Sequence, residues 1–400
     1  MPSPRRALTT LFLIVFTDLV GFGIVIPLLP LYAEHFRPAP WVFGLLMASY
    51  SAMQFIFSPI LGRISDRVGR RPVLLISIAG SVAGFVLFAL AHSLAWLFAS
   101  RLLAGICGGN VATAQAVIAD TTPPEKRARG MGLIGAAFGL GFIAGPALAG
   151  VLAPVSMAAP GWGAAVFSVC AWTMTLLFLP ETRPTAGADR RHAPASGFAR
   201  LAYGFGHAEL APLLAIGFLF VTGFAAFEVT FAQFLHERLA LPHSGVGFLF
   251  VYVGVLAAAV QGGLVGRATR RFGERDLLLG GLAAAAVGLL ILSGLHTLAG
   301  VMTVLPLASL GAGLAMPSIS SLVSRSARAD EQGAALGAFQ GIGSLARVVG
   351  PFTAELAVGA WGVASPQLGA AALSAVAALG VGLVLRRRPA SAQAAAPPAY

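Results

Sequence analysis

Long apolar runs, separated by short polar segments, follow one another along the whole chain. Each run holds roughly 20 residues, which is the length that an α-helix needs to cross about 30 Å of hydrocarbon. We predict twelve membrane spans, at residues 8–29, 41–61, 72–92, 94–119, 130–153, 161–180, 211–235, 244–266, 276–296, 298–324, 332–357 and 366–385. The pattern therefore predicts an all-α membrane protein with twelve transmembrane helices in a lipid bilayer.

The composition agrees with this pattern and excludes a soluble globular protein. Apolar residues make up 57% of the chain and charged residues only 10%, whereas about a quarter of the residues in soluble domains are charged. The first apolar run is too long for a cleavable signal peptide and contains Asp18, so we interpret it as the first membrane helix.

The net charge of +11 is explained by membrane topology. Of the 26 lysines and arginines, 22 fall before the first span, after the last one, or in the connections that follow even-numbered spans. Arg37 and Arg238 fall on the other side, and Arg101 and Arg347 fall inside spans. Because basic residues collect on the cytoplasmic side, both termini are predicted to be cytoplasmic. Nucleic acid is therefore not an expected partner.

The longest polar stretch divides the chain into two halves of six spans each. It contains prolines and glycines, such as Pro184 and Gly187, which are typical of a connection. We predict an N-terminal half at 1–180, a cytoplasmic linker at 181–210, a C-terminal half at 211–387 and a disordered tail at 388–400.

The two halves resemble each other at a nearly constant offset. Gly62, Gly69 and Arg71 recur 204 residues later as Gly266, Gly273 and Arg275, and Glu125, Gly132, Gly145 and Pro146 recur 205 residues later as Asp330, Gly337, Gly350 and Pro351. Because both halves start and end in the cytoplasm, the duplication is parallel, with a pseudo-two-fold axis along the membrane normal. Such symmetry favours a substrate site between the halves, although a channel or a receptor is also compatible with it.

A charged turn lies between the second and third spans, where residues 62–71 read GRISDRVGRR. Its charges cannot lie in hydrocarbon, so it must lie at the membrane surface. Gly62 allows close helix packing and Gly69 permits a turn. Asp66 can cap a helix or pair with Arg67 or Arg70, and Asp120 at the end of the fourth span offers a second carboxylate.

The second copy of this turn leaves two interpretations open. Asp66 corresponds to Arg270 there and Arg70 corresponds to Glu274, so charge is kept while the pattern is lost. The turn therefore either has a role that depends on its exact residues in the first half or marks the topology in both halves.

Four motifs resemble those of the major facilitator superfamily, and more narrowly its drug/proton antiporters of the tetracycline-resistance type. They are the turn at 62–71, DLVGFGIVIPLLPLY at 18–32, RLLAG at 101–105 and GFIAGPALAG at 141–150. The resemblance implies a twelve-helix secondary transporter of the bacterial inner membrane that is monomeric, uses no cofactor and is not an enzyme. Its partners would be protons and a small-molecule substrate.

The resemblance also assigns roles to two sets of residues. The gating set, which would latch the outward-open state, is Gly62, Arg63, Asp66, Arg67, Gly69, Arg70, Arg71 and Asp120. The antiporter set, which would shape the cavity and limit leak, is Gly141, Gly145, Pro146 and Gly150. The small residues of the second set also predict plain backbone-to-backbone helix packing, with a bend at the proline.

One segment departs from the tetracycline exporters. Residues 80–85 read GSVAGF, where an acidic residue is expected in the middle of the third span. The departure indicates a different or broader range of drugs.

Ionisable side chains within spans give the sharper functional signal, because each costs about 2.5–3.5 kcal/mol at the middle of the bilayer and usually marks a pathway. Asp18 is our first candidate for a proton carrier, with a structural, hydrogen-bonded acid as the alternative. Arg101 matches an arginine that, by the resemblance, influences proton transfer.

Glu228 and Arg347 are further candidates. Glu228 is flanked at helical spacing by phenylalanines, of which Phe224 and Phe231 could contact a lipophilic cation, although such a stripe also suits plain packing. Arg347 shares a polar helix face with Gln340, which indicates either an aqueous cavity or an interhelical ion pair. The lesser cavity candidates are Asn110 and Gln115, amides that often only join helices.

Other chemistries lack the required motifs. The sequence has no glycine-rich phosphate loop followed by Lys and Ser or Thr, its histidines form no ligand-like pair inside a span, and Cys107 and Cys170 fall in separate spans. We therefore predict no metal site and no disulfide.

We interpret the chain as a proton-coupled secondary transporter that exports small, lipophilic or drug-like compounds by alternating access. Asp18 and Glu228 would exchange protons for substrate. The alternative within the class is a proton-coupled sugar or metabolite transporter, and the alternative from another class is a membrane receptor or scaffold that keeps a transporter fold.

Overall fold

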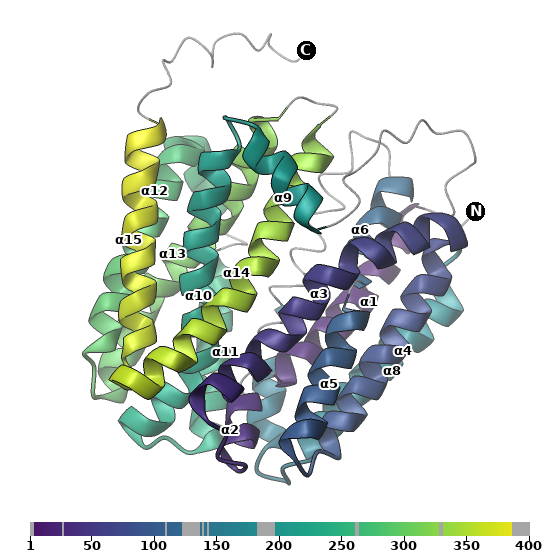
Figure 1. Cartoon of the computed structure of the whole chain (residues 1–400), viewed down its shortest axis with the longest axis horizontal. Helices are drawn as coiled ribbons and strands as arrows, with labels where there is room; N and C mark the ends of the chain where they lie inside the picture. Colours follow the sequence, from purple (N-terminus) through teal and green to yellow (C-terminus); the bar gives the residue numbers. More distant parts are fainter. Residues whose placement is uncertain are drawn as a thin grey trace.

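The computed structural model describes residues 4–25, 28–108, 110–121, 137, 140–141, 144–181, 197–260, 264–327 and 331–385. These residues form helices and connections, and no β-strand occurs among them. The helices gather into two bundles, one from each half of the chain (Figure 1).

The first bundle contains the helices that precede residue 181. They are α1 (Pro4–Val25), α2 (Leu29–Glu34), α3 (Pro40–Val68), α4 (Arg70–Ala89), α5 (Leu94–Cys107), α6 (Asn110–Thr121), helical residues 144–152 and α8 (Ala159–Phe178).

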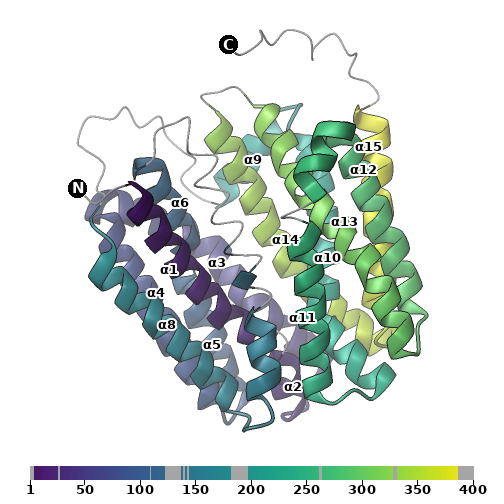
Figure 2. The same ribbon diagram turned by 180° about the vertical axis from the view of Figure 1, so that it is seen from behind.

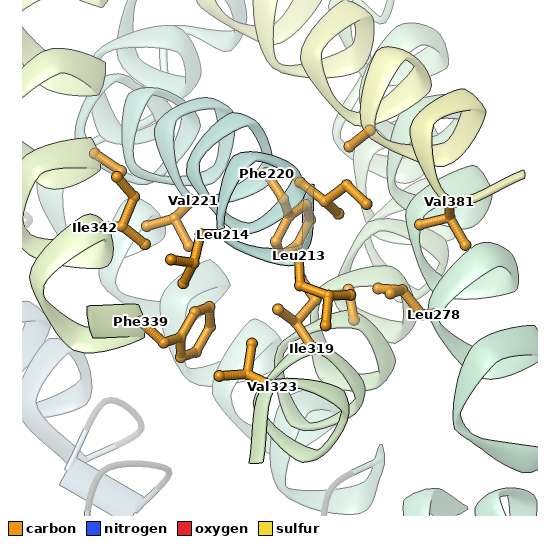
Figure 3. Packing of buried hydrophobic residues seen from close by; sticks show 14 of the residues in the cluster. Leu213, Leu214, Phe220, Val221, Leu278, Ile319, Val323, Phe339, Ile342 and Val381 are labelled. Atoms are coloured by element: carbon orange, nitrogen blue, oxygen red, sulfur yellow. The ribbon is translucent and has the colours of Figure 1, made fainter. Parts of the chain in front are cut away.

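The second bundle follows a short connecting helix, α9 (Gly197–Gly206). Its helices are α10 (Ala211–Leu239), α11 (His243–Ala259), α12 (Val265–Ser293), α13 (Leu298–Arg325), α14 (Gln332–Trp361) and α15 (Ser365–Leu385). Its core is filled by branched and aromatic side chains from α10, α12, α13, α14 and α15 (Figure 3).

Seven of the described helices are long and apolar enough, by length and composition, to cross a membrane. They are α3, α4, α8, α10, α12, α13 and α15. Three further apolar helices are shorter, at Thr9–Val25, Leu94–Cys107 and Gly245–Leu256. These shorter helices lie within the predicted spans 8–29, 94–119 and 244–266.

The predicted span 94–119 contains two helices, and a carbonyl group between them has a hydrogen-bond partner on another helix. Helix α5 ends at Cys107 and α6 begins at Asn110. The side-chain amide of Gln54 on α3 donates a 2.9 Å hydrogen bond to the carbonyl oxygen of Gly108. A carbonyl left free at a helix end needs such a partner inside the membrane, so Gln54 joins two helices.

The repeated glycines at 69 and 273 occupy the same kind of turn. Gly69 has φ +119° between α3 and α4, and Gly273 has φ +78° at a kink within α12. Only glycine adopts such angles without strain. The span predicted to end at 266 and the one predicted to begin at 276 are thus joined at Gly273, as α3 and α4 are joined at Gly69.

The two bundles meet along α3 and α14. Helix α1 begins and α15 ends at the same end of the molecule, which we call the terminal end (Figures 1 and 2). At the opposite end α3 and α14 approach closely. A Cβ added to Gly44 would lie 3.0 Å from the carbonyl oxygen of Phe352, and one added to Gly359 would lie 2.7 Å from Pro40. We call this contact of Pro40 and Gly44 with Phe352, Glu355 and Gly359 the α3–α14 seam.

Candidate functional site

Arg70 is the centre of the charged turn at the terminal end. Its guanidinium contacts Asp66 at 2.6 Å, Asp120 at 2.9 Å and the hydroxyl of Ser65 at 2.7 Å. The Arg70 side chain is only 8% exposed, whereas those of Asp66 and Asp120 are 37% and 23% exposed. The structure therefore brings three members of the predicted gating set into one cluster that links the ends of α3, α4 and α6.

A third carboxylate, which the sequence analysis assigned only to the linker, completes this cluster. An oxygen of Glu181 accepts a 2.9 Å hydrogen bond from the backbone N–H of Arg70. The same carboxylate lies 2.6 Å from the position that a Cβ on Gly69 would take. An acid at a helix start satisfies a free N–H group and interacts favourably with the helix dipole. Only a residue without a side chain at position 69 leaves room for it.

The remaining members of the gating set lie around the cluster. Arg63 and Arg67 are exposed. Arg71 donates a 2.5 Å hydrogen bond to the carbonyl oxygen of Leu176 on α8. A Cβ added to Gly62 would meet nothing within 4 Å, so the structure gives no close helix contact at this glycine.

The second half contains a related cluster. Glu274, at the position equivalent to Arg70, contacts Arg325 at 3.4 Å and accepts a 2.6 Å hydrogen bond from the hydroxyl of Ser321. Arg325 lies 205 residues after Asp120. The pair between these two helix ends is therefore present in both halves, with opposite charges.

Three of the ionisable residues predicted within spans interact electrostatically with Tyr50 on α3, and the fourth interacts with one of these three. Asp18 on α1, Arg101 on α5 and Arg347 on α14 all interact electrostatically with the Tyr50 hydroxyl. Arg347 also interacts electrostatically with Glu228 on α10. The network thus joins both halves of the chain.

Packing fixes the position of several of these groups. Asp18 is 9% exposed and Arg101 is 2% exposed. The Arg101 guanidinium lies 5.4 Å from the centre of the Phe88 ring, at the range of a cation–π contact, and donates a 3.1 Å hydrogen bond to Ser100. The Tyr50 ring packs 4.8 Å from that of Phe22.

The phenylalanines of α10 pack mainly against one another. Phe231 is 1% exposed and its ring lies 4.9 Å from Phe227 and 5.7 Å from Phe250 of α11. Phe224 is half-buried and lies 6.1 Å from Phe220. Phe231 therefore belongs to the core of the second bundle in this structure, and Phe224 is the more accessible of the two candidates.

The antiporter glycines lie at helix crossings. A Cβ on Gly141 would lie 2.7 Å from the Cβ of Leu19, and one on Gly145 would lie 2.6 Å from the backbone of Gly23. Pro146 lies 3.4 Å from the Cβ position of Gly23. Gly150 is 2.5 Å from the Cβ position of Gly247, across the two bundles. Each of these close approaches has a glycine on at least one side, where the missing side chain leaves room for the neighbouring helix.

The structure describes the remaining cavity candidates less completely. Gln340 on α14 is exposed, and Ser344 accepts a 3.3 Å hydrogen bond from Arg347. The side chains of Asn110 and Gln115 lie outside the described residues. In the part of the chain that the structure describes, no group of three or more His, Cys, Asp or Glu side chains could hold a metal ion.

The sequence analysis missed Tyr50, Glu181 and Glu355. Glu355 lies in the predicted span 332–357 and is 2% exposed, so the same search for ionisable residues within spans could have found it. Tyr50 and Glu181 carry no such signal, because only the fold brings them to their partners.

Comparison with known proteins places the chain among membrane transporters. The sequence profile of the Major Facilitator Superfamily matches residues 11–351 and, in a second match, 213–399. The tetracycline resistance protein of class D from Salmonella ordonez is 33% identical over 347 residues, 84% of this chain and 86% of that protein. The human major facilitator superfamily domain-containing protein 10 is 30% identical over 88% of this chain and 87% of its own length.

Solved structures agree with this placement. The crystal structure of the human organic anion transporter MFSD10 (TETRAN) matches with a TM-score of 0.74 and 27% identity, over 95% of this chain and 100% of that chain. A bacterial homologue of the human lysosomal transporter Spinster has the same fold, with a TM-score of 0.80 at 16% identity over 97% of this chain and 98% of its own.

Proposed function

The chain belongs to the Major Facilitator Superfamily, and on this premise we propose that it exports small, lipophilic or drug-like compounds in exchange for protons. The observation that carries the proposal is the electrostatic network in which Tyr50 connects Asp18 of the first half with Arg347 of the second. A transporter that alternates between two states needs its coupling groups where the halves meet.

Coupling follows from competition between a proton and the cargo. Asp18 and Glu228 are acids within membrane-spanning helices, where each binds a proton or interacts with a positive group. Arg347 interacts with Glu228, so a change at one group alters the field at the other. Movement of the halves would separate Arg347 from Tyr50 and change which acid holds the proton.

The cluster around Arg70 would limit when the halves move. It ties together the ends of α3, α4 and α6 at the terminal end, and rearrangement of these helices must stretch or break its ion pairs. We assign the terminal end to the cytoplasm because basic residues collect there. We place the protein in a bacterial inner membrane as a monomer whose halves, 1–180 and 211–387, move relative to each other while the helices of the first half rearrange.

The test is a transport assay in everted membrane vesicles with an imposed proton gradient. A panel of labelled lipophilic compounds, including tetracycline, would be followed with the unchanged protein and with Asp18→Asn. We expect proton-driven accumulation of at least one compound, lost in Asp18→Asn. Full activity in that variant would remove Asp18 from the coupling mechanism, and no proton-driven uptake of any compound would contradict export by antiport.

A second candidate cargo is an organic anion. It is favoured by two arginines in the central network, the buried Arg101 and the half-buried Arg347, and by the similarity to MFSD10, a human organic anion transporter. The same vesicles distinguish the two classes, because an anionic cargo would require Arg347 and Arg101, whereas a cationic cargo would require Glu228. Loss of anion transport in Arg347→Gln with retention in Glu228→Gln would favour this candidate.

A further inference from the structure

The hydroxyl of Tyr50, which is the centre of the electrostatic network, lies against the end of α5. Tyr50 and Gln54 are four residues apart on α3, so their side chains are neighbours on one face of that helix. Helix α5 crosses this face at Gly105, whose missing side chain lets α5 pack on the backbone of Tyr50. The crossing brings Gly108, the residue that caps the end of α5, to both side chains.

One amide group reaches two acceptors at this place. The side-chain nitrogen of Gln54 donates a 2.9 Å hydrogen bond to the carbonyl oxygen of Gly108 and a longer one, of 3.5 Å, to the hydroxyl oxygen of Tyr50. An amide nitrogen carries two N–H groups, so it can donate to both at once. The shorter bond is the stronger of the two, and it fixes the nitrogen beside the hydroxyl.

Gly108 leaves the space in which the hydroxyl lies. A Cβ at this position would lie 2.8 Å from the Tyr50 hydroxyl oxygen and 3.3 Å from the Gln54 nitrogen. The φ of Gly108 is −69°, an angle that every residue adopts, so glycine is needed here for space and not for its conformation. Gln54 and Gly108 thus confine the hydroxyl from two sides.

A hydroxyl confined in this way has a direction as well as a position. The Tyr50 oxygen accepts from Gln54, so its own hydrogen points away from the amide and is available to donate. The charges that act on the hydroxyl come from Asp18 and Arg101 of the first half and from Arg347 of the second. A dipole that is already oriented responds to such charges without first having to reorient.

We propose that Gln54 is a positioning residue for proton coupling, which holds the Tyr50 hydroxyl against Gly108 and keeps it oriented toward the charged groups of both halves. This proposal rests on the proposed function, in which the network around Tyr50 couples protons to transport. In this role Gln54 binds neither a proton nor cargo and affects coupling through Tyr50. Loss of its amide should therefore impair coupling as much as loss of the hydroxyl itself.

The first test compares single and double variants in everted vesicles, with the labelled compound that the unchanged protein accumulates. Uphill, proton-driven transport and downhill counterflow are both measured at equal protein levels. Gln54→Met removes both donors and keeps the length of the side chain. We expect it to lower uphill transport severalfold, as Tyr50→Phe does, while counterflow persists. The double variant should transport uphill no more slowly than Tyr50→Phe alone, because the hydroxyl that Gln54 holds is already absent.

Two results of this test would overturn the proposal. Losses that multiply in the double variant, or counterflow that falls as far as uphill transport, would show that Gln54 acts through helix packing alone. The matched control is Gln233→Met on α10, which also replaces a half-buried amide. The side-chain oxygen of Gln233 receives no hydrogen bond within the described part of the chain, so both kinds of transport should persist. If Gln54→Met does not reach the membrane, Gly108→Ala takes its place under the same criteria, because it displaces the hydroxyl and keeps the amide.

The second test needs no transport. Thermal unfolding in detergent is compared for Gly108→Ala with and without Tyr50→Phe. We expect Gly108→Ala to lower the melting temperature, and Tyr50→Phe to recover part of the loss by removing the oxygen that the new Cβ meets. Gly105→Ala is the matched control, since its Cβ would meet the backbone of Tyr50 and the side chain of Met53. Its loss should be the same in both backgrounds.

The two tests separate this inference from the proposed function. A loss for Gly108→Ala that is equal in both backgrounds would overturn the inference, whether or not protons drive transport. Proton-driven transport together with losses that multiply would contradict the inference alone. Absence of proton-driven transport in the unchanged protein would contradict the proposed function, and the recovered melting temperature would still support the position of the hydroxyl.

Discussion

Glu274 and Arg325 form an ion pair that repeats the Arg70–Asp120 pair of the first half with both charges reversed. The two pairs join equivalent helix ends, 204 and 205 residues apart. A charge reversed at one position alone would have set like charges against each other. Because the charge is reversed at both positions, the attraction is kept. The second turn therefore retains the ion pair although neither of its two residues matches the equivalent residue of the first half.

This pair predicts a charge-exchange result. Glu274→Arg alone should place two positive charges together and slow transport, and adding Arg325→Asp should restore much of the rate. Because Arg325 is 69% exposed, the effect on the free energy of unfolding should stay within about 1 kcal/mol. Transport rates in vesicles, compared at equal protein levels, would measure it. A double variant as slow as the single one would contradict a paired role.

The two turns should differ in their importance. Asp66→Asn removes a direct partner of the buried Arg70 and should slow conformational cycling more than membrane insertion. Arg270→Asn, at the equivalent exposed position, should change neither. Counterflow rates, set against the amount of protein in the membrane, would compare the two variants, and equal slowing by both would contradict the assignment of the gate to the first turn.

Gly69 and Gly273 form a matched pair for backbone strain. Gly69→Ala should destabilise the protein, because a Cβ would meet the Glu181 carboxylate and the positive φ disfavours other residues by about 1–3 kcal/mol. Gly273→Ala shares the positive φ but meets nothing within 4 Å, so it should cost less. Thermal unfolding in detergent would give the difference, and equal losses would show that the Glu181 contact adds nothing.

The close packing of Gly145 on Gly23 predicts intolerance of larger residues. Gly145→Leu should force α1 away from helical residues 144–152 and lower the yield of folded protein or permit proton leak. Gly280→Leu on α12 is the control, since nothing lies within 4 Å of its Cβ position. Size-exclusion profiles and the decay of an imposed pH gradient would test both effects.

The Tyr50 hydroxyl should be needed for coupling and not for folding. Tyr50→Phe keeps the ring contact with Phe22 and removes the group on which Asp18, Arg101 and Arg347 act. We expect uphill, proton-driven transport to fall while downhill counterflow persists. The control is Tyr252→Phe, which removes a hydroxyl that donates to the carbonyl of Met302 and should leave both kinds of transport intact. If Tyr50→Phe also left both intact, the network would have no role in coupling.

The sequence by itself determined the membrane character, the helical fold and the family of this protein. Span length and charge distribution are properties of consecutive residues. Because the bilayer has a fixed thickness and basic residues collect on its cytoplasmic side, both properties can be recognised in the sequence. The repeat was readable for the same reason, because the turn glycines at 69 and 273 each need their own positive φ. The candidate acids were found because charge inside a span is costly wherever the helix lies.

Only the tertiary structure decided which of these residues meet. The contact of Glu181 with Gly69 and Arg70, the pairing of Glu274 with Arg325, and the bond from Gln54 to Gly108 all join segments that are distant in the chain. The position of Glu355 at the seam likewise depends on the two halves packing through Gly44 and Gly359. In a membrane nearly every surface is apolar, so hydrophobicity does not select neighbours. Small residues and polar side chains select the neighbouring helices instead. The contacts that they make can be identified only when the fold shows which helices lie next to each other.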